Sequence, residues 1–116
     1  MPAQLFDRSL PHDAREALFG GKATVRVWNL GAAPLPPFTA TLGCELDPGG
    51  SVGTHVQQEF AEIVVGISGD GRATVSGDEQ LLQGGSVVQL PLGATLAIEN
   101  ASASEPLRYL IIKARG

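Results

Sequence analysis

The feature that most constrains the fold is the regular punctuation of the chain by glycine and proline. From residue 20 onward they recur every few positions, and short runs rich in valine, isoleucine, leucine and threonine lie between them. Short β-prone runs separated by turn formers are typical of all-β sandwiches and barrels. The pattern predicts about nine strands, over Ala23–Trp28, Phe38–Leu46, Val52–Gln57, Phe60–Ile67, Arg72–Ser76, Gln80–Gln83, Ser86–Leu90, Ala94–Glu99 and Leu107–Lys113.

The alternation of residues along these runs indicates which strands are covered on both sides. Phe38–Leu46 alternates apolar and mixed positions, as expected for an antiparallel sheet with one buried face. Phe60–Ile67 is apolar on both faces except for Glu62, and Leu107–Ile112 is apolar on both faces except for Arg108. Their outer faces need a cover, either the N-terminal segment or a second subunit. Because open sheet edges also favour pairing, a homodimer is expected.

The N-terminal region carries the signals of a short helix. Proline suits the first helical turn and Gly20-Gly21 is a natural stop, so Pro11–Phe19 is predicted to be helical. A chain of 116 residues is expected to form one domain. We expect residues 1–22 to be an N-terminal segment of the same domain and residues 23–116 to be the barrel.

Charge and composition exclude several classes of partner. The net charge of −4 and the pI near 5.0 argue against nucleic acid, which requires a basic face. No apolar stretch has the length of a membrane span, and the N-terminus has no signal-peptide core. A cytoplasmic location is therefore expected. The lone Cys44 is interpreted as a small buried apolar residue.

Two spaced motifs stand in the middle of the chain. The first has glycine, then histidine six residues later, then glutamate and glycine at intervals of seven; the second has glycine, proline, glycine and asparagine. They resemble the paired motifs of the cupin superfamily, small antiparallel jelly-roll barrels, and the resemblance covers close to half of the chain. The matching residues are Gly49, His55, Glu62 and Gly69, followed by Gly85, Pro91, Gly93 and Asn100.

The resemblance implies a metal centre whose ligand set is incomplete in this chain. In metal-binding cupins, two histidines and a glutamate of the first motif and a histidine of the second converge inside the barrel. Here Gln57 and Leu96 replace two of those histidines. No tightly bound metal is expected, because two strong ligands seldom hold a transition metal. If a divalent transition metal did bind, His55, Glu62 and Gln57 would hold it. Glu45, Glu59 and His12 are the possible recruits.

The same residues predict a pocket. His55, Gln57, Glu62 and Leu96 are expected to line the barrel interior, as the ligand pocket. Burial should raise the pKa of Glu62 unless His55 pairs with it as the imidazolium. His55 and Glu62 are the candidate catalytic pair; they act either as acid and base or as a satisfied polar pair in a binding pocket. The sequence does not decide whether Tyr109 lines this cavity.

Three functions remain open at this point. The first is a cupin that binds a small organic molecule in the barrel without a tightly bound metal. The second is a metal-dependent enzyme of oxygenase or isomerase type with a reduced ligand set. The third is a metal-free acid–base enzyme that uses His55 and Glu62. Among the remaining motif residues, Asn100 is predicted to cap a strand end through hydrogen bonds to the backbone.

Overall fold

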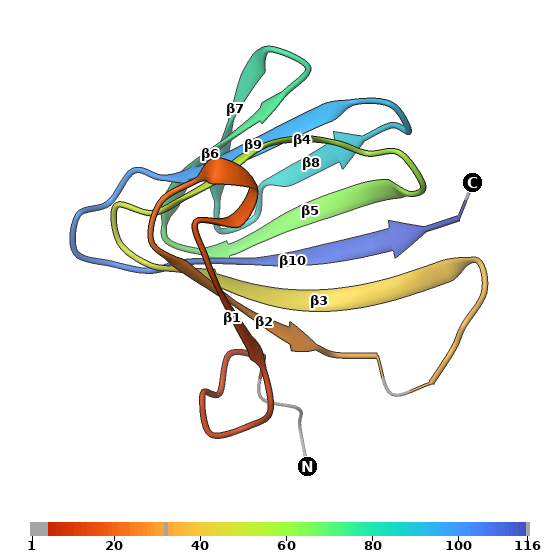
Figure 1. The fold of residues 1–116 in the computed structure, drawn as a ribbon, viewed down its shortest axis with the longest axis horizontal. Coiled ribbons are helices and arrows are strands. Elements are labelled where there is room, and N and C mark those ends of the chain that lie inside the picture. Colours follow the sequence, from red (N-terminus) through yellow and green to blue (C-terminus); the bar gives the residue numbers. More distant parts are fainter. Residues whose placement is uncertain (1–4, 32, 116) are drawn as a thin grey trace.

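The computed structural model describes residues 5–31 and 33–115, which form two antiparallel sheets packed face to face (Figure 1). One sheet has six strands in the order β1-β2-β3-β10-β5-β8, and the other has four in the order β4-β9-β6-β7. The strands are β1 (Asp13–Glu16), β2 (Thr24–Asn29), β3 (Phe38–Leu46), β4 (Ser51–Val56), β5 (Ala61–Ser68), β6 (Asp70–Val75), β7 (Asp78–Gln83), β8 (Val87–Leu90), β9 (Thr95–Asn100) and β10 (Leu107–Ala114). The prediction of an all-β antiparallel barrel is confirmed.

All nine predicted strands are present as β2 to β10, with their ends within two residues of the predicted positions. The turn residues explain this agreement. Gly69, Gly77, Gly85 and Gly93 each adopt a positive φ between strands, which glycine does without a steric cost. The positions of these glycines in the sequence therefore indicate where the strands end.

The helix predicted over Pro11–Phe19 is wrong. Residues 13–16 form β1, which pairs with β2, and Leu18–Gly20 form a single 3-10 turn, η1. Ala17 (φ 49°) and Phe19 (φ 53°) adopt left-handed backbone conformations that a helix excludes. A segment of this length makes a marginal helix with no apolar stripe to bury. Pairing along the edge of β2 instead satisfies the backbone groups of β1.

The core lies between the two sheets. Inward-facing residues alternate along each strand, and those of the six-stranded sheet meet those of the four-stranded sheet. The largest fully buried apolar side chains include Leu46, Leu82, Leu90, Leu96 and Leu107. One end of the barrel is fixed by the buried Asn100, which donates to the carbonyl of Glu105 (2.9 Å) and accepts from the amide of Ser102 (2.9 Å). The predicted role of Asn100 is thus confirmed.

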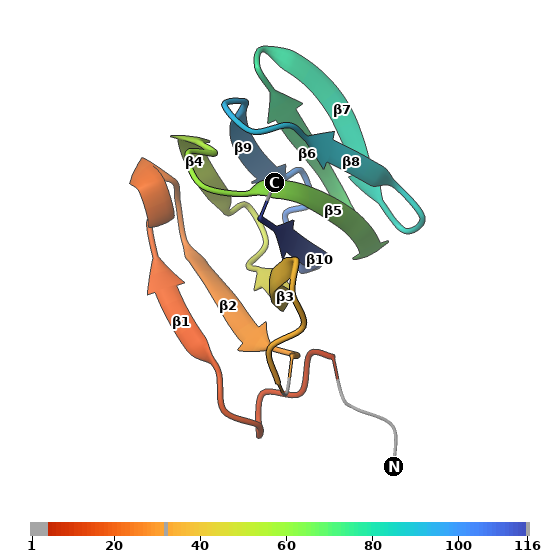
Figure 2. The same ribbon diagram turned by 90° about the vertical axis from the view of Figure 1, so that its right-hand side faces the viewer.

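Residues 5–12, called here the N-terminal strap, cover part of the outer face of the six-stranded sheet. The ring of Phe6 packs edge-on against buried Trp28, whose Nε1 donates to the carbonyl of Asp7 at 2.8 Å. Arg8 from the strap and Arg108 from β10 both donate to the buried carboxylate of Glu45. Figure 2 shows β1 and β2 at the end of this sheet that lies away from β6 and β7. The strap is one of the two covers expected from the sequence.

Away from Arg108, the outer face of β5, β8 and β10 is largely apolar and lies beyond the strap. It carries Ile63, Val65, Ile67, Val87, Leu110 and Ile112, of which Ile63, Ile67 and Val87 are exposed. The sequence predicts a cover, either the N-terminal segment or a second subunit, for the outer faces of β5 and β10. Within residues 5–31 and 33–115, no helix is long and apolar enough to cross a membrane.

Candidate functional site

A cavity of about 390 Å³ opens between the two sheets. His55, Gln57, Glu62 and Leu96 all line it, so the structure brings the four predicted pocket residues together. The strands explain why. His55 on β4 lies directly opposite Leu96 on β9, and Glu62 faces inward from β5 on the other sheet. The cavity is therefore walled by both sheets.

His55 is held in one orientation by its surroundings. Its Nδ1 lies 3.1 Å from the carbonyl oxygen of Gly53. Because a carbonyl only accepts, this hydrogen bond assigns a proton to Nδ1, and in the neutral imidazole Nε2 is then the acceptor. The ring of Phe19 stacks on the imidazole, with centroids 4.1 Å apart and planes 15° apart. The imidazole therefore makes this hydrogen bond to the backbone and not to Glu62.

Gly53 allows the segment around Phe19 to approach the site. A Cβ atom at Gly53 would lie 1.8 Å from the carbonyl oxygen of Phe19, so only glycine permits this contact. Leu18, packed against the core, and Phe19 both line the cavity beside His55. The turn η1 thus contributes to the cavity wall and orients the histidine.

Glu62 is the buried acid of the site, with 5% of its surface exposed. Burial raises the pKa of its carboxyl above the ordinary value, as expected from the sequence. Lys113, with Nζ 3.9 Å from Oε2, lowers this pKa in part, and His55 and the amide of Gln57 lower it further. Because burial outweighs these opposing effects, a larger fraction of Glu62 than of an exposed glutamate is protonated at a given pH.

Cys44 and Tyr109 also line the cavity. Burial raises the pKa of the Cys44 thiol to about 12, so the sulfur stays protonated at neutral pH. Burial also raises the pKa of the Tyr109 hydroxyl, which lies in hydrogen-bonding contact with Cys44. Tyr109 therefore lines the cavity, and neither group supplies an anionic ligand.

The donor set does not fit the metal centre implied by the resemblance. Leu96 presents an apolar wall opposite His55, and Gln57 offers a neutral amide. Across residues 5–31 and 33–115 there is no group of three or more His, Cys, Asp and Glu side chains that could hold a metal ion. We therefore consider the chemistry that the side chains of the site can carry out themselves.

The three possible recruits lie apart from His55 and Glu62 or face away from them. Glu45 is bound by two arginines on the outer face of the sheet. His12 packs on Trp28, with ring centroids 4.8 Å apart. Glu59 lies exposed at the rim of the cavity. None of the three completes a ligand set with His55 and Glu62.

Among the residues of the cavity wall that sequence reasoning missed are Arg15, Phe19 and Lys113. Arg15 and Phe19 come from the segment that was predicted as a helix. Lys113 continues the inward-facing row of β10 that includes Tyr109 and Ile111, so strict alternation along that strand would have found it.

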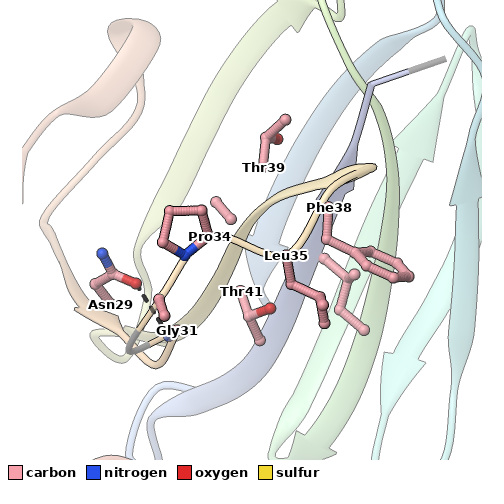
Figure 3. A pocket seen from close by; sticks show the side chains of 10 residues that line it. Asn29, Gly31, Pro34, Leu35, Phe38, Thr39 and Thr41 are labelled. Atoms are coloured by element: carbon pink, nitrogen blue, oxygen red, sulfur yellow. Dashed lines mark hydrogen bonds between the residues drawn. The ribbon is translucent and has the colours of Figure 1, made fainter.

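A second groove, of about 800 Å³, lies beside the connection between β2 and β3 (Figure 3). Its lining includes Pro34, Leu35 and Phe38, with the hydroxyl groups of Thr39 and Thr41. None of the described residues that line it is ionisable. The groove thus offers contact area without acid–base chemistry, and the barrel cavity remains the candidate site.

No protein-family model and no curated protein matches the chain. Solved structures do. A predicted oxalate decarboxylase from Thermotoga maritima is 22% identical, with 98% of this chain and 100% of that chain covered and a TM-score of 0.87. A cupin 2 conserved barrel domain protein from Salinispora arenicola is 25% identical, with 97% and 87% covered and a TM-score of 0.67. A putative sugar phosphate isomerase from Acidithiobacillus ferrooxidans is 26% identical, with 80% and 60% covered and a TM-score of 0.68.

These likenesses agree with the chain itself. The two motifs, from Gly49 to Gly69 and from Gly85 to Asn100, place their residues on strands and turns of a two-sheet antiparallel barrel. The neighbours carry several different activities in their names, so they indicate the fold and no single reaction. The chain belongs to the cupin superfamily.

Proposed function

We propose that this cupin binds a small organic molecule in the barrel cavity without a tightly bound metal. The observation that carries the proposal is the cavity itself. Its volume of about 390 Å³ is in the range of small-ligand sites. Its wall combines apolar side chains such as Val27 and Ile98 with a few polar groups, among them His55 and Gln57. Such a division suits an apolar ligand with one anchoring group.

The proposal is tested by filling the cavity. Leu96 is almost fully buried in the wall, and Leu96→Phe adds volume toward the space a ligand would occupy. In a thermal-shift screen of small metabolites, we expect compounds that stabilise the wild type to lose that effect in Leu96→Phe. A ligand present at 100 times its Kd stabilises the fold by about 2.7 kcal/mol, which is readily measured.

Leu81→Phe is the matched control, because Leu81 is exposed and lies outside the cavity lining. It should leave the response to every compound unchanged. A broad metabolite set that yields no stabilising compound for the wild type would count against the binding function. Compounds that stabilise Leu96→Phe as much as the wild type would place their site elsewhere.

A metal-free acid–base enzyme is the second candidate, supported by the states of His55 and Glu62. In the neutral imidazole of His55, the Nδ1 proton is donated to the carbonyl of Gly53, so Nε2 is the nitrogen that can accept a proton. Burial raises the pKa of Glu62, so its carboxyl can donate one at a higher pH than an exposed glutamate. A turnover that is unchanged in Glu62→Gln would remove this candidate.

The raised pKa of Glu62 predicts a specific pH dependence of stability. Because the folded state binds this proton more tightly than the unfolded state, the contribution of Glu62 is greatest below its ordinary pKa of 4.5. It is lost as the pH rises through the raised pKa of the folded state. We therefore expect the free energy of unfolding of the wild type, relative to Glu62→Gln, to fall as the pH rises above 4.5. Urea unfolding of both proteins from pH 4 to 8 measures this difference; a constant or rising difference would contradict it.

We further propose that a second copy of the chain covers the outer face of β5, β8 and β10. The exposed side chains of Ile63, Ile67 and Val87 lie together on that face and carry no charge. Two copies of this apolar cluster can therefore pack against each other without electrostatic repulsion. Sedimentation velocity should find a dimer, and Ile67→Glu should shift it toward the 12.0 kDa monomer. A wild type that sediments only as the monomer would rule this assembly out.

A further inference from the structure

Lys113 places a positive charge in the cavity wall that neither function above requires. It follows Tyr109 and Ile111 in the inward-facing row of β10 and lines the same cavity. Long cationic side chains on strands usually extend to the solvent. Here 31% of the Lys113 side chain is exposed, and the ammonium group lies beside buried Glu62.

The ammonium group of Lys113 is only loosely engaged. Its Nζ lies 3.9 Å from Oε2 of Glu62, longer than the 2.7–3.2 Å of an N–H···O hydrogen bond. On the other side, the partner of Lys113 across the strand pair is Ala40, which offers no acceptor from its side chain. Among the described residues, none accepts a hydrogen bond from this ammonium. Its donors therefore remain available to a group in the cavity.

A second cation lies on the same sheet, at the rim of the cavity. Arg15 on β1 lines the cavity, and its ion pair is a long one, 3.7 Å, to the exposed carboxylate of Asp13. Between Arg15 and Lys113, the wall of the six-stranded sheet is apolar and includes Val25, Val27 and Leu42. The sheet thus presents an apolar surface with a cation on either side of it.

Glu62 decides where an anion can lie. An ionised Glu62 repels a second carboxylate, so a ligand carboxylate would bind Lys113 on the side of β3, away from β5. Leu42 of β3 lines the cavity on that side and can contact an apolar chain attached to the carboxylate. A hydrogen bond between a lysine and a carboxylate is charge-assisted and about twice as strong as a neutral one.

We infer that the cavity selects small organic anions, namely a carboxylate on a short apolar chain, and that Lys113 is the residue that binds the carboxylate. This inference rests on the proposed binding function and specifies its ligand class. A neutral molecule of the same shape would gain the apolar contacts alone. A matched cation would meet the charge of Lys113 at close range.

The test uses three probes of equal chain length: hexanoate, 1-hexanol and hexylamine. Isothermal titration calorimetry at pH 7 is run with the wild type, Lys113→Met and Lys22→Met. Lys22 is the other lysine of the chain and is exposed outside the cavity, so Lys22→Met removes the same charge elsewhere. Because Lys113→Met leaves Glu62 without its cation, thermal unfolding first checks that the variant is folded. Lys113→Arg, which keeps the charge, serves as the second variant.

We expect the wild type to bind hexanoate about tenfold or more tightly than 1-hexanol. Lys113→Met should abolish that preference, and Lys22→Met and Lys113→Arg should keep it. Equal binding of hexanoate and 1-hexanol by the wild type, or tighter binding of hexylamine, would overturn the anion inference and leave the binding function standing. If none of the three probes binds, both fail for ligands of this size.

Discussion

The double variant Gln57→His/Leu96→His is expected to bind a divalent transition metal more tightly than the wild type. Gln57 and Leu96 line one cavity with His55 and Glu62, so the substitutions bring the donor set to three imidazoles and one carboxylate. That set matches the preferences of zinc, nickel, iron and manganese. Because Leu96 lies opposite His55 on the neighbouring strand, the new imidazole would enter the site from the second motif.

The expected effect is large. Metal at 100 times its Kd adds about 2.7 kcal/mol to the stability of the folded state. For a domain of this size that corresponds to a rise in Tm of roughly 10 °C. Without metal, an imidazole in place of nearly fully buried Leu96 should lower the stability, because a buried polar ring lacks its partners. The Tm of the variant should therefore rise with nickel or zinc and fall with a chelator.

Controls separate a designed centre from adventitious binding. Adding Glu62→Ala to the double variant keeps both new histidines and removes one native ligand, so the metal-dependent rise in Tm should largely disappear. Gln57→His alone retains Leu96 and should bind metal more weakly than the double variant. Elemental analysis by mass spectrometry gives the stoichiometry, expected near one. A folded double variant whose Tm does not respond to metal would show that the four side chains do not converge.

The strands could be predicted because their signals are local. Alternation along Phe38–Leu46 and glycines such as Gly69 and Gly77 mark where strands run and where they turn. The β1 strand has no such signal, since its four residues are all exposed and bury no face. It exists through its pairing with β2, a contact between segments that no window of the sequence displays. The left-handed conformations of Ala17 and Phe19 are equally invisible, because neither residue favours them.

The candidate site also has a part that the sequence predicts and a part that it does not. His55, Gln57, Glu62 and Leu96 occupy motif positions, so the resemblance predicted that one cavity would gather them. The partners that set their chemistry are not in the motifs. The proton on His55 Nδ1 is fixed by the backbone carbonyl of Gly53, and the ring is held by Phe19 from the N-terminal region. Lys113 comes from the last strand, 51 positions beyond Glu62 in the sequence.

Gly66 within β5 is a further position whose role only the packing reveals. A Cβ atom built there would lie 1.9 Å from the carbonyl oxygen of Gln83 and 2.8 Å from its carbonyl carbon. Both are backbone atoms, so no side-chain rotation relieves the contact. The amide of Gly66 also donates to the carbonyl of Ser86 at 2.8 Å, and its carbonyl accepts from the amide of Gly85 at 3.0 Å. Any shift of β5 away from Gln83 therefore strains these two hydrogen bonds.

Gly66→Ala is accordingly expected to lower the free energy of unfolding by about 3 kcal/mol or more, at the upper end of overpacking effects. Gly31→Ala is the matched control. The nearest atom to a Cβ at Gly31 is Oδ1 of Asn29, at an ordinary contact distance of 3.7 Å, so the change should stay within about 0.5 kcal/mol. Urea unfolding followed by the fluorescence of buried Trp28 measures both variants. If Gly66→Ala lost less than about 1 kcal/mol, the close approach of β5 to the end of β7 would have to be looser than the structure describes.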